Sequence, residues 1–461
     1  MNQDSSLPID GLKQPQRFWA MVTTGIGVFV TVVASSVVNV ALPTIAADMK
    51  VDASTTVWVV NAYQVAIMLA LLPLASLGDI FGYRRVYLGG LALFSAASLA
   101  CALAPSFAAL VFLRVAQGLG AAGVMSVNTA LVRFTHPAHR LGHGIGLNAV
   151  VIAASAAAGP AIASAILAVL SWPWLFAVNV PLGIVGIAIG AYALPRTARA
   201  SHKFDVVSTI LSAITFGTLI ALIDAIGHQG SARLIGTEFA IASIFAVVLC
   251  QRQMAMTSPL LPIDLLRIPL FTLSIVTCAL SFAAQMLALI GLPFHLRALG
   301  YSAVDIGLLM TPWPLATALV APISGRLSDR YPAGLLGLLG LLIFAAGLAA
   351  LALSPAPIQT ANILLFMALA GLGFGLYQTP NNRTMQAAAP RARSGAASGF
   401  VAMARVLGQT IGAALAGLLF SHLAGGGAVA AIWLGVGFAV LGAIASSIRL
   451  TDSPQQKPTR G

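Results

Sequence analysis

One charged turn between two apolar runs carries the most distinctive chemistry in this sequence. It lies in the stretch LASLGDIFGYRRVYLGG and holds a carboxylate, two glycines and two guanidinium groups: Asp79, Gly78, Gly82, Arg84 and Arg85. A carboxylate and a nearby arginine can form a charge-assisted hydrogen bond, and glycine permits positive φ and close backbone approach. We therefore expect Arg84 or Arg85 to hold the carboxylate of Asp79 in a short turn between two helices. The alternative is a plain basic signal of membrane topology.

No grouping of side chains in the sequence predicts an enzyme. Cys101, Cys250 and Cys278 stand far apart in apolar runs, without the spacing of a disulfide or zinc site. The glycine-rich pieces GLGAAG and GLGFGL also lie inside apolar runs and lack the lysine that binds phosphate. The sequence brings no serine, histidine and acid together. We expect no catalytic residue, no metal ion and no cofactor.

The composition requires a membrane protein. Hydrophobic residues make up 59% of the 461 residues and charged residues only 8%, against about 45–50% and about 25% in soluble proteins. The formal net charge of +12 would also fit a nucleic-acid-binding protein. However, the topology predicted below places almost all lysines and arginines on one side of the bilayer, as the positive-inside rule requires. The basic charge therefore encodes orientation, and we expect the lipid bilayer as a partner and no nucleic acid.

Apolar runs of membrane-crossing length, about 20 residues each, recur about fourteen times along the chain. We predict an all-α polytopic membrane protein with both ends in the cytoplasm. Its predicted segments are an N-terminal tail (1–17), a six-helix bundle (18–195), a linker with two inserted transmembrane helices (196–268), a second six-helix bundle (269–448) and a C-terminal tail (449–461).

A weaker copy of the charged turn occurs in the second half. In SGRLSDRYP, Gly325 and Asp329 keep the four-residue spacing of Ala75 and Asp79, and Arg330 follows. A repeat after the second helix of each six predicts two parallel halves, related by an axis along the membrane normal. Asp329 with Arg330 would then form a second, weaker ion pair of the same kind.

The turn and several other segments resemble a known family. ASLGDIFGYRR is similar to the loop signature of the major facilitator superfamily, with Ala75 where the family usually has glycine. The segments VVNVALP, WVVNAYQVA, LRVAQGLGAAG, WPWLFAVNVPLG and GYSAVDIGLLMTPWPL resemble its fourteen-helix drug:proton antiporter branch. The resemblance covers nearly the whole chain and implies the major facilitator fold, with two six-helix bundles and two extra helices inserted between them. In that family the charged turn latches the cytoplasmic side in one state.

Two further motifs contain the coupling residues that the resemblance implies. Arg114 and Gln117 lie on one face of the fourth span, and a guanidinium within a span is costly unless it is solvated or paired. Similar arginines in the family are implicated in proton-linked conformational coupling, and an arginine that only fixes helix packing is the alternative. Gly159 and Pro160 match the core of the family's fifth-helix antiporter motif, with a kinked packing helix as the alternative.

One feature of the family is missing. Many of its cation exporters carry an acid shortly before the NVALP segment, where this chain has Ala34, and no aspartate or glutamate lies near the midpoint of any core span. Proton antiport usually needs a carboxylate or histidine that titrates between two accessible states. Asp79, Asp224 or the substrate itself are the remaining proton carriers. With Arg114 and Arg405 inside spans, we expect neutral, zwitterionic or weakly acidic amphipathic substrates.

A sparse set of polar side chains within the spans is available to line a substrate cavity. These candidates are Asn39, Asn61, Gln64, Asn128, Asn148, Gln285, Gln378 and Arg405. A mostly apolar pocket with a few polar groups suits small amphipathic ligands. For each amide, the alternative is a helix–helix hydrogen bond.

Together these features predict a secondary active transporter that exports drugs or metabolites by alternating access, with protons as the coupling ion, in the bacterial inner membrane. We expect it to act as a monomer on a small-molecule substrate. Two alternatives stay open: a facilitator or importer of the same fold, and a transport-inactive membrane sensor or scaffold. The lack of a sizeable soluble domain counts against the second.

Overall fold

The computed structural model describes residues 11–137, 140–197, 204–227, 231–256, 263–354, 359–388, 394–423 and 425–450. Every regular element within these ranges is a helix, which confirms the all-α prediction. Long apolar stretches form helices in a membrane because each backbone amide must find its hydrogen-bond partner inside the segment. The predicted tails, 1–17 and 449–461, lie mostly outside the described ranges.

Fourteen spans in the described part of the chain are long and apolar enough to cross a membrane, as the sequence predicts. Three of these spans consist of two helices that meet at a one-residue break. The pairs are α2 (Ala53–Thr56) with α3 (Trp58–Phe81), α7 (Trp174–Ala177) with α8 (Asn179–Ala193), and α12 (Ala303–Met310) with α13 (Pro312–Leu327). The residue at each break keeps right-handed helical dihedrals, so each pair continues in one direction.

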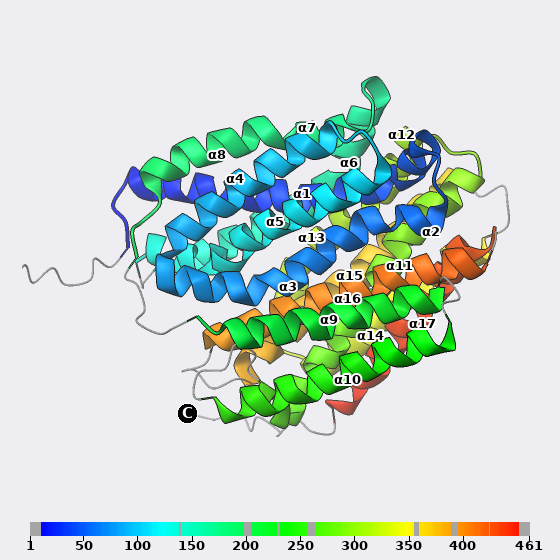
Figure 1. The fold of residues 1–461 in the computed structure, drawn as a ribbon. Coiled ribbons are helices and arrows are strands. Elements are labelled where there is room, and N and C mark those ends of the chain that lie inside the picture. The colour runs from blue at the N-terminus through cyan, green and yellow to red at the C-terminus, as the bar shows by residue number, and fades with distance from the viewer. Residues whose placement is uncertain are drawn as a thin grey trace, which may run out of the picture. The chain divides into compact units, whose positions relative to one another are not determined.

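The chain forms two compact units, Met1–Gly217 and Thr218–Gly461, and the boundary falls inside α9 (Val206–Gly227). The pairs α2/α3 and α7/α8 belong to unit 1, and the pair α12/α13 belongs to unit 2. Unit 1 also holds α1 (Gln16–Met49), α4 (Tyr83–Ala102), α5 (Phe107–Thr135) and α6 (Leu141–Val169). Unit 2 holds α10 (Ala232–Ala255), the 3₁₀ helix η2 (Ile263–Arg267), α11 (Pro269–Ala298), α14 (Ala333–Leu353), α15 (Thr360–Ala388), α16 (Ser394–His422) and α17 (Gly427–Ile448). Figure 1 shows these helices in chain order from blue to red. The predicted boundaries between tails, bundles and linker stay predictions.

Close glycine contacts hold unit 1 together. Helix α5 packs against α3 and α4, and α1 packs against α6 and α8. A Cβ on Gly90 of α4 would lie 2.9 Å from the carbonyl oxygen of Gly120 on α5, and a Cβ on Gly120 would overlap the backbone nitrogen of Phe94. Small residues that let two backbones approach closely are a common basis of helix association in membranes.

Unit 2 repeats this arrangement. Helix α15 packs against α13 and α14, and α11 packs against α16 and α17. A Cβ on Gly373 of α15 would overlap the backbone nitrogen of Phe344 on α14, just as one on Gly120 would meet Phe94 in unit 1. The two bundles therefore share one packing pattern, which confirms the repeat that the sequence predicts.

Candidate functional site

The turn between α3 and α4 is built around a residue with positive φ. Helix α3 ends at Phe81, Gly82 has a φ of 95° and α4 begins at Tyr83. Side chains other than glycine rarely adopt this conformation. A Cβ on Gly78 would lie 2.7 Å from Cγ1 of Val127, so this glycine lets α3 lie close to α5. Both glycines of the predicted latch therefore have a defined structural role.

The polar contacts of the α3–α4 turn differ from the predicted ones. The hydroxyl of Tyr83 donates a hydrogen bond to Oδ1 of Asp79. The sequence predicts Arg84 or Arg85 as a partner of that carboxylate. Instead, Arg84 donates to two backbone carbonyls near the end of α8, those of Ala191 and Leu194. The reason is that α4 packs against α8, which brings the end of α8 within reach of the guanidinium.

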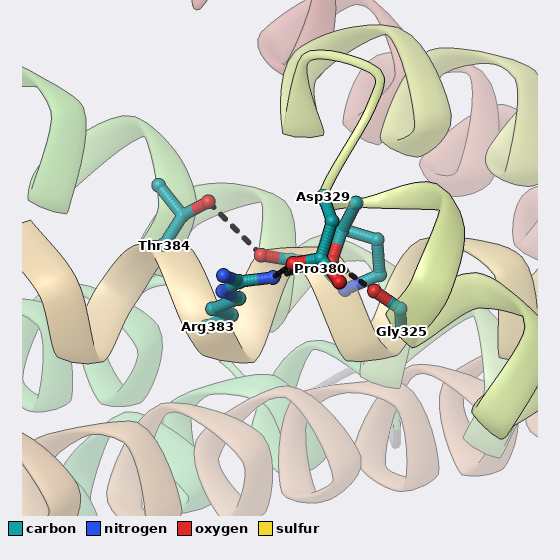
Figure 2. Close-up of polar contacts among 6 residues, drawn as sticks. Gly325, Asp329, Pro380, Arg383 and Thr384 are labelled. Atoms are coloured by element: carbon teal, nitrogen blue, oxygen red, sulfur yellow. Dashed lines mark hydrogen bonds and ion pairs between the residues drawn. The ribbon is translucent and has the colours of Figure 1, made fainter. Parts of the chain in front are cut away.

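The turn between α13 and α14 contains an ion pair (Figure 2). Nη1 of Arg383, on α15, pairs with Oδ1 of Asp329 and donates to Oγ of Ser328 at 3.0 Å. The sequence predicts Arg330 as the partner of Asp329, and the structure corrects this to Arg383, because α15 lies against α13 and presents its arginine to the turn. The two side chains are 60% and 61% exposed, so solvent screens the pair. Arg330, like Arg85 of the first turn, is exposed.

Local hydrogen bonds support both sides of this ion pair. Directly after α13, Oγ of Ser328 donates to the carbonyl of Gly325 at 2.7 Å. On α15, Oγ1 of Thr384 donates to the carbonyl of Pro380 at 2.9 Å, as Figure 2 shows. Pro380 lies inside α15 and supplies no backbone N–H to the helix. Arg383 therefore projects from a proline-containing turn of α15.

Arg114 is fully buried in α5, and neighbouring helices hold its guanidinium. Nε donates to the carbonyl of Val59 at 2.8 Å, Nη1 donates to Oε1 of Gln117 at 2.5 Å, and Cζ lies 4.1 Å from the ring centroid of Tyr63. Gln117 in turn donates to Oγ of Ser98 on α4 at 2.7 Å. Nη2 is buried with no hydrogen-bond partner among the described residues. Arg114 and Gln117 thus form one network that joins α3, α4 and α5.

The matching position of unit 2 is apolar. Gly118 on α5 packs against the carbonyl oxygen of Tyr63, and Gly371 on α15 packs in the same way against that of Trp313. Four residues before these glycines stand Arg114 and Met367, and both are fully buried. Helix packing at this position therefore does not require an arginine.

Gly159 and Pro160 lie in α6, which packs against α1. A Cβ on Gly159 would overlap the side chain of Ser36 on α1, so the glycine sets the spacing of the two helices. Pro160 lies inside the helix and removes one backbone donor. The structure thus shows a close-packed helix that contains proline, and a role of this pair in coupling stays a prediction.

The predicted cavity residues of unit 1 differ in their contacts. Asn128 donates from Nδ2 to Oδ1 of Asn148 at 2.9 Å, which joins α5 to α6, and Asn39 donates to a carbonyl within α1. Asn39, Asn61, Gln64 and Asn128 are all buried. The Oδ1 atoms of Asn39, Asn61 and Asn128 have no hydrogen-bond partner in the described ranges. These three oxygens remain as acceptors for a ligand or for water.

Unit 2 contributes Gln285, Gln378 and Arg405, and all three are half-buried. Arg405 lies in α16, with Cζ 5.2 Å from the ring centroid of Phe282 on α11. Its Nε is buried, and its guanidinium has no hydrogen bond or ion pair within the part of the chain that the structure describes. Arg405 therefore differs from Arg114, whose guanidinium is held by two hydrogen bonds.

The structure adds a polar cluster that sequence reasoning missed. Arg449, which the sequence assigns to the C-terminal tail, directly follows α17 and is 1% exposed. Nη1 donates to Oγ of Ser274 at 3.0 Å and to Oδ1 of Asn381 at 2.7 Å, and Nη2 donates to Oγ of Ser446 at 2.5 Å. Burial lowers the pKa of Arg449 to about 10, so it stays charged at neutral pH. Ser274 and Asn381, two polar residues near the ends of apolar runs, are the signals that could have indicated this cluster.

The remaining titratable residues add no further site. No group of three or more His, Cys, Asp or Glu that could hold a metal lies in the described ranges. Cys101, Cys250 and Cys278 are free thiols. The side chain of Asp224, one of the predicted proton carriers, lies outside the described part of the structure.

Comparison with known proteins decides the family. The model of the Major Facilitator Superfamily matches residues 24–289 and 273–461. The chain belongs to this superfamily. It is therefore a multi-pass membrane transporter, and fourteen helical spans in its described part are long and apolar enough to cross a membrane.

Relatives of this superfamily member span nearly its whole length. It is 48% identical over 446 residues to the protein named Uncharacterized transporter YebQ of Escherichia coli K12. This alignment covers 96% of this chain and 98% of YebQ. It is 30% identical to Riboflavin transporter RibZ of Clostridioides difficile, over 88% of this chain and 89% of RibZ. It is 31% identical to Multidrug resistance protein Stp of Mycobacterium tuberculosis, over 86% of this chain and 74% of Stp. These relatives confirm the resemblance to the drug:proton antiporter type of the superfamily.

Solved structures confirm the fold. A bacterial homolog of the human lysosomal transporter Spinster, in an inward-facing and unoccupied conformation, aligns with a TM-score of 0.70 at 16% identity, over 97% of this chain and 100% of that one. The inward-open xylose transporter XylE from E. coli aligns with a TM-score of 0.66 at 13% identity, over 96% of this chain and 98% of XylE. At such low identity the likeness shows the fold alone, which is the major facilitator fold.

Proposed function

We propose that this transporter exports small amphipathic compounds, drugs or metabolites, from the cytoplasm across the bacterial inner membrane by proton-coupled antiport. The observation that carries the proposal is the similarity over most of the chain to Stp, a protein named for multidrug resistance. The chemistry of the interior agrees with it, because buried amide oxygens without partners are set among apolar side chains in unit 1. Sparse polar groups in apolar surroundings suit amphipathic ligands.

Alternating access requires bundles that move as bodies, with contacts that fasten one state. Each unit here is compact and has glycine-dependent packing that resists deformation. We assign this fastening to the two turns, on the cytoplasmic side, and contacts within its own unit order each of them. In the first, Asp79 accepts from Tyr83 while Arg84 binds the end of α8. In the second, Asp329 pairs with Arg383.

Arg114, Gln117, Gly159 and Pro160 would serve the coupling of proton movement to this conformational change. The network of Arg114 joins three helices of unit 1, so a shift of any of them changes the surroundings of the charge. The apolar Met367 at the matching position of unit 2 supports a role beyond packing. Breaking the hydrogen bonds of a buried charge is costly, which lets such a network favour discrete states.

Topology completes the proposal. If the fourteen spans found among the described residues all cross the membrane, both termini lie on the same side, and the distribution of lysine and arginine predicts that this side is the cytoplasm. We propose a monomer as the functional unit, since each chain contains both bundles.

A facilitator without proton antiport is the second candidate. It is favoured by one observation: no aspartate or glutamate lies near the midpoint of a core span. A facilitator lets its substrate equilibrate and cannot move it uphill, so the two candidates differ in their response to a proton gradient.

An efflux screen in a host that lacks its own drug pumps tests export. Cells that express the protein should accumulate less of some amphipathic compounds than cells that carry the empty vector, and an uncoupler should abolish the difference. If no compound changes, or if accumulation rises, the export proposal is wrong. A faster approach to the same final level, equal with and without the uncoupler, would favour the facilitator.

A further inference from the structure

Arg405 places a positive charge near the middle of the membrane-spanning part of unit 2. Its guanidinium lies over Phe282, which stands thirteen residues after the start of α11 at Pro269 and sixteen before its end at Ala298. Helices α11 and α16 run parallel, because a Cβ on Gly408 would meet Ala279 and one on Gly412 would meet Ala283. By this register the backbone of Arg405, three residues before Gly408, lies level with Val276 of α11, and its guanidinium reaches from there to Phe282 near the middle of α11.

This charge has no counter-charge in the described part of the protein. The ring of Phe282 supplies a cation–π contact with Cζ 5.2 Å from the centroid, and Nε is buried with no hydrogen-bond partner there. Two fully buried arginines of the described structure are held differently. Arg114 bonds to Val59 and Gln117, and Arg449 bonds to three side chains.

The partial burial of Arg405 limits the kind of surroundings that the exposed part of its side chain can have. The side chain is half-buried, so part of it is open on the surface of unit 2. A guanidinium at this depth is too costly to face hydrocarbon unless it is solvated or paired. The open part must therefore face a polar space. No aspartate or glutamate near the midpoint of any core span can neutralise it, and lipid headgroups lie at the membrane surfaces, far from the middle of α11.

We infer that Arg405 binds the anionic group of an amphipathic substrate, of the class of organic carboxylates and sulfonates with an apolar or aromatic body. This deepens the proposed export function and rests on it. Phe282, 4% exposed, contacts the guanidinium, and because Nε is buried, the N–H groups of Nη1 and Nη2 are the donors for the ligand. Gln285, three residues further along α11 and half-buried, adds an amide close to the same face. An arginine fork suits a planar carboxylate because it can donate two parallel hydrogen bonds.

An anionic substrate also accounts for the missing membrane carboxylate. The inside-negative membrane potential favours outward movement of a negative charge. A binding site for an anion needs a cation, not an acid. Such a site therefore fits a chain that has no aspartate or glutamate near the midpoint of any core span.

Ligand binding to the purified full-length protein in nonionic detergent tests this inference. The probes are pairs that share one ring system and differ in charge: 1-pyrenebutanoate against the matching pyrenebutyl trimethylammonium ion, and two further aromatic pairs of the same design. Wild type should bind at least one anion tenfold or more tightly than its cationic partner. The Arg405→Gln variant should weaken binding of that anion at least tenfold and leave the cation within twofold. Arg405→Lys should recover part of the affinity, and Arg330→Gln, which removes an exposed arginine, should change neither.

Each outcome separates this inference from the export proposal. If no anion binds more tightly than its cationic partner, or if Arg405→Gln binds the anion as well as wild type, the assignment of Arg405 is wrong, whether or not the efflux screen succeeds. If the anion binds through Arg405 but no compound is exported in the screen, the assignment stands and the export proposal fails. Should Arg405→Gln not fold, the comparison of the paired probes on wild type and Arg405→Lys still decides.

Discussion

Arg449 donates a hydrogen bond from Nη1 to Oδ1 of Asn381 at 2.7 Å and so joins the end of α17 to α15 inside unit 2. Asn381 in turn donates to the carbonyl of Ser274 on α11 at 3.1 Å. Ser446, a further partner of Arg449, donates to the carbonyl of Gly334 on α14 at 2.9 Å. One guanidinium therefore connects four helices of the same bundle.

Removal of this guanidinium should destabilise the protein. Hydrogen bonds from a charged group contribute about 1.5–3 kcal/mol each, and the buried acceptors of Arg449 would be left without a donor. We expect Arg449→Ala to lower the free energy of unfolding by at least about 2 kcal/mol, measured by reversible unfolding in mixed micelles. Arg330→Ala, at an exposed position, is the control and should stay within about 0.5 kcal/mol of wild type. An unchanged Arg449→Ala variant would show that the cluster contributes nothing to stability.

Arg114→Met separates packing from coupling. Methionine already fills the matching position of unit 2, at Met367, and apolar replacement of a buried charge is often neutral for stability. We expect the variant to express and to unfold within about 1.5 kcal/mol of wild type, but to lose at least tenfold in substrate efflux. Full efflux in Arg114→Met would mean that the arginine serves packing alone.

Two glycines on neighbouring helices test the packing of unit 1. A Cβ on Gly120 would overlap the backbone of Phe94, whereas a Cβ on Gly89 meets nothing within 4 Å. We expect Gly120→Ala to destabilise by about 1–3 kcal/mol because the α4 and α5 backbones must separate. Gly89→Ala should be neutral or stabilising by up to about 1 kcal/mol, since alanine favours helix. Thermal unfolding of both variants in detergent measures the difference, and equal midpoints would rule out the close contact.

The two charged turns should differ in their effect on transport. Asp79 accepts from Tyr83 and lies in a half-buried turn, whereas Asp329 and Arg383 are 61% and 60% exposed. Exposed ion pairs contribute only about 0–1 kcal/mol. Asp79→Asn should therefore reduce the efflux rate at least tenfold at unchanged expression, and Asp329→Asn less than fivefold. Wild-type rates in Asp79→Asn would count against the latch.

The fold could be predicted from the sequence because each span is an apolar run of sufficient length, and charge placement suggests the repeat. The contacts between helices could not be predicted from the sequence. The expected partners of Asp79 and Asp329 were their neighbours in sequence, but packing of α4 on α8 and of α15 on α13 brought Arg84 to the end of α8 and Arg383 to Asp329. Sequence spacing does not show which helices pack together.

The sequence also did not show which single charged side chains are buried. The sequence places Arg114 and Arg405 inside spans, and the structure shows that one is held by hydrogen bonds while the other is not. Arg449 looked like an ordinary basic residue at a span end. Its burial depends on small neighbours such as Gly337, where a Cβ would lie 3.0 Å from Nη2 of Arg449. Such a pocket is a property of three-dimensional packing.

Transport by the purified protein in sealed proteoliposomes tests the central claim most directly. With an imposed pH gradient, a substrate found in the efflux screen should accumulate severalfold above its external concentration, and a protonophore should return it to equilibrium. Substrate movement that only equilibrates, at the same rate with and without the gradient, would contradict proton-coupled export.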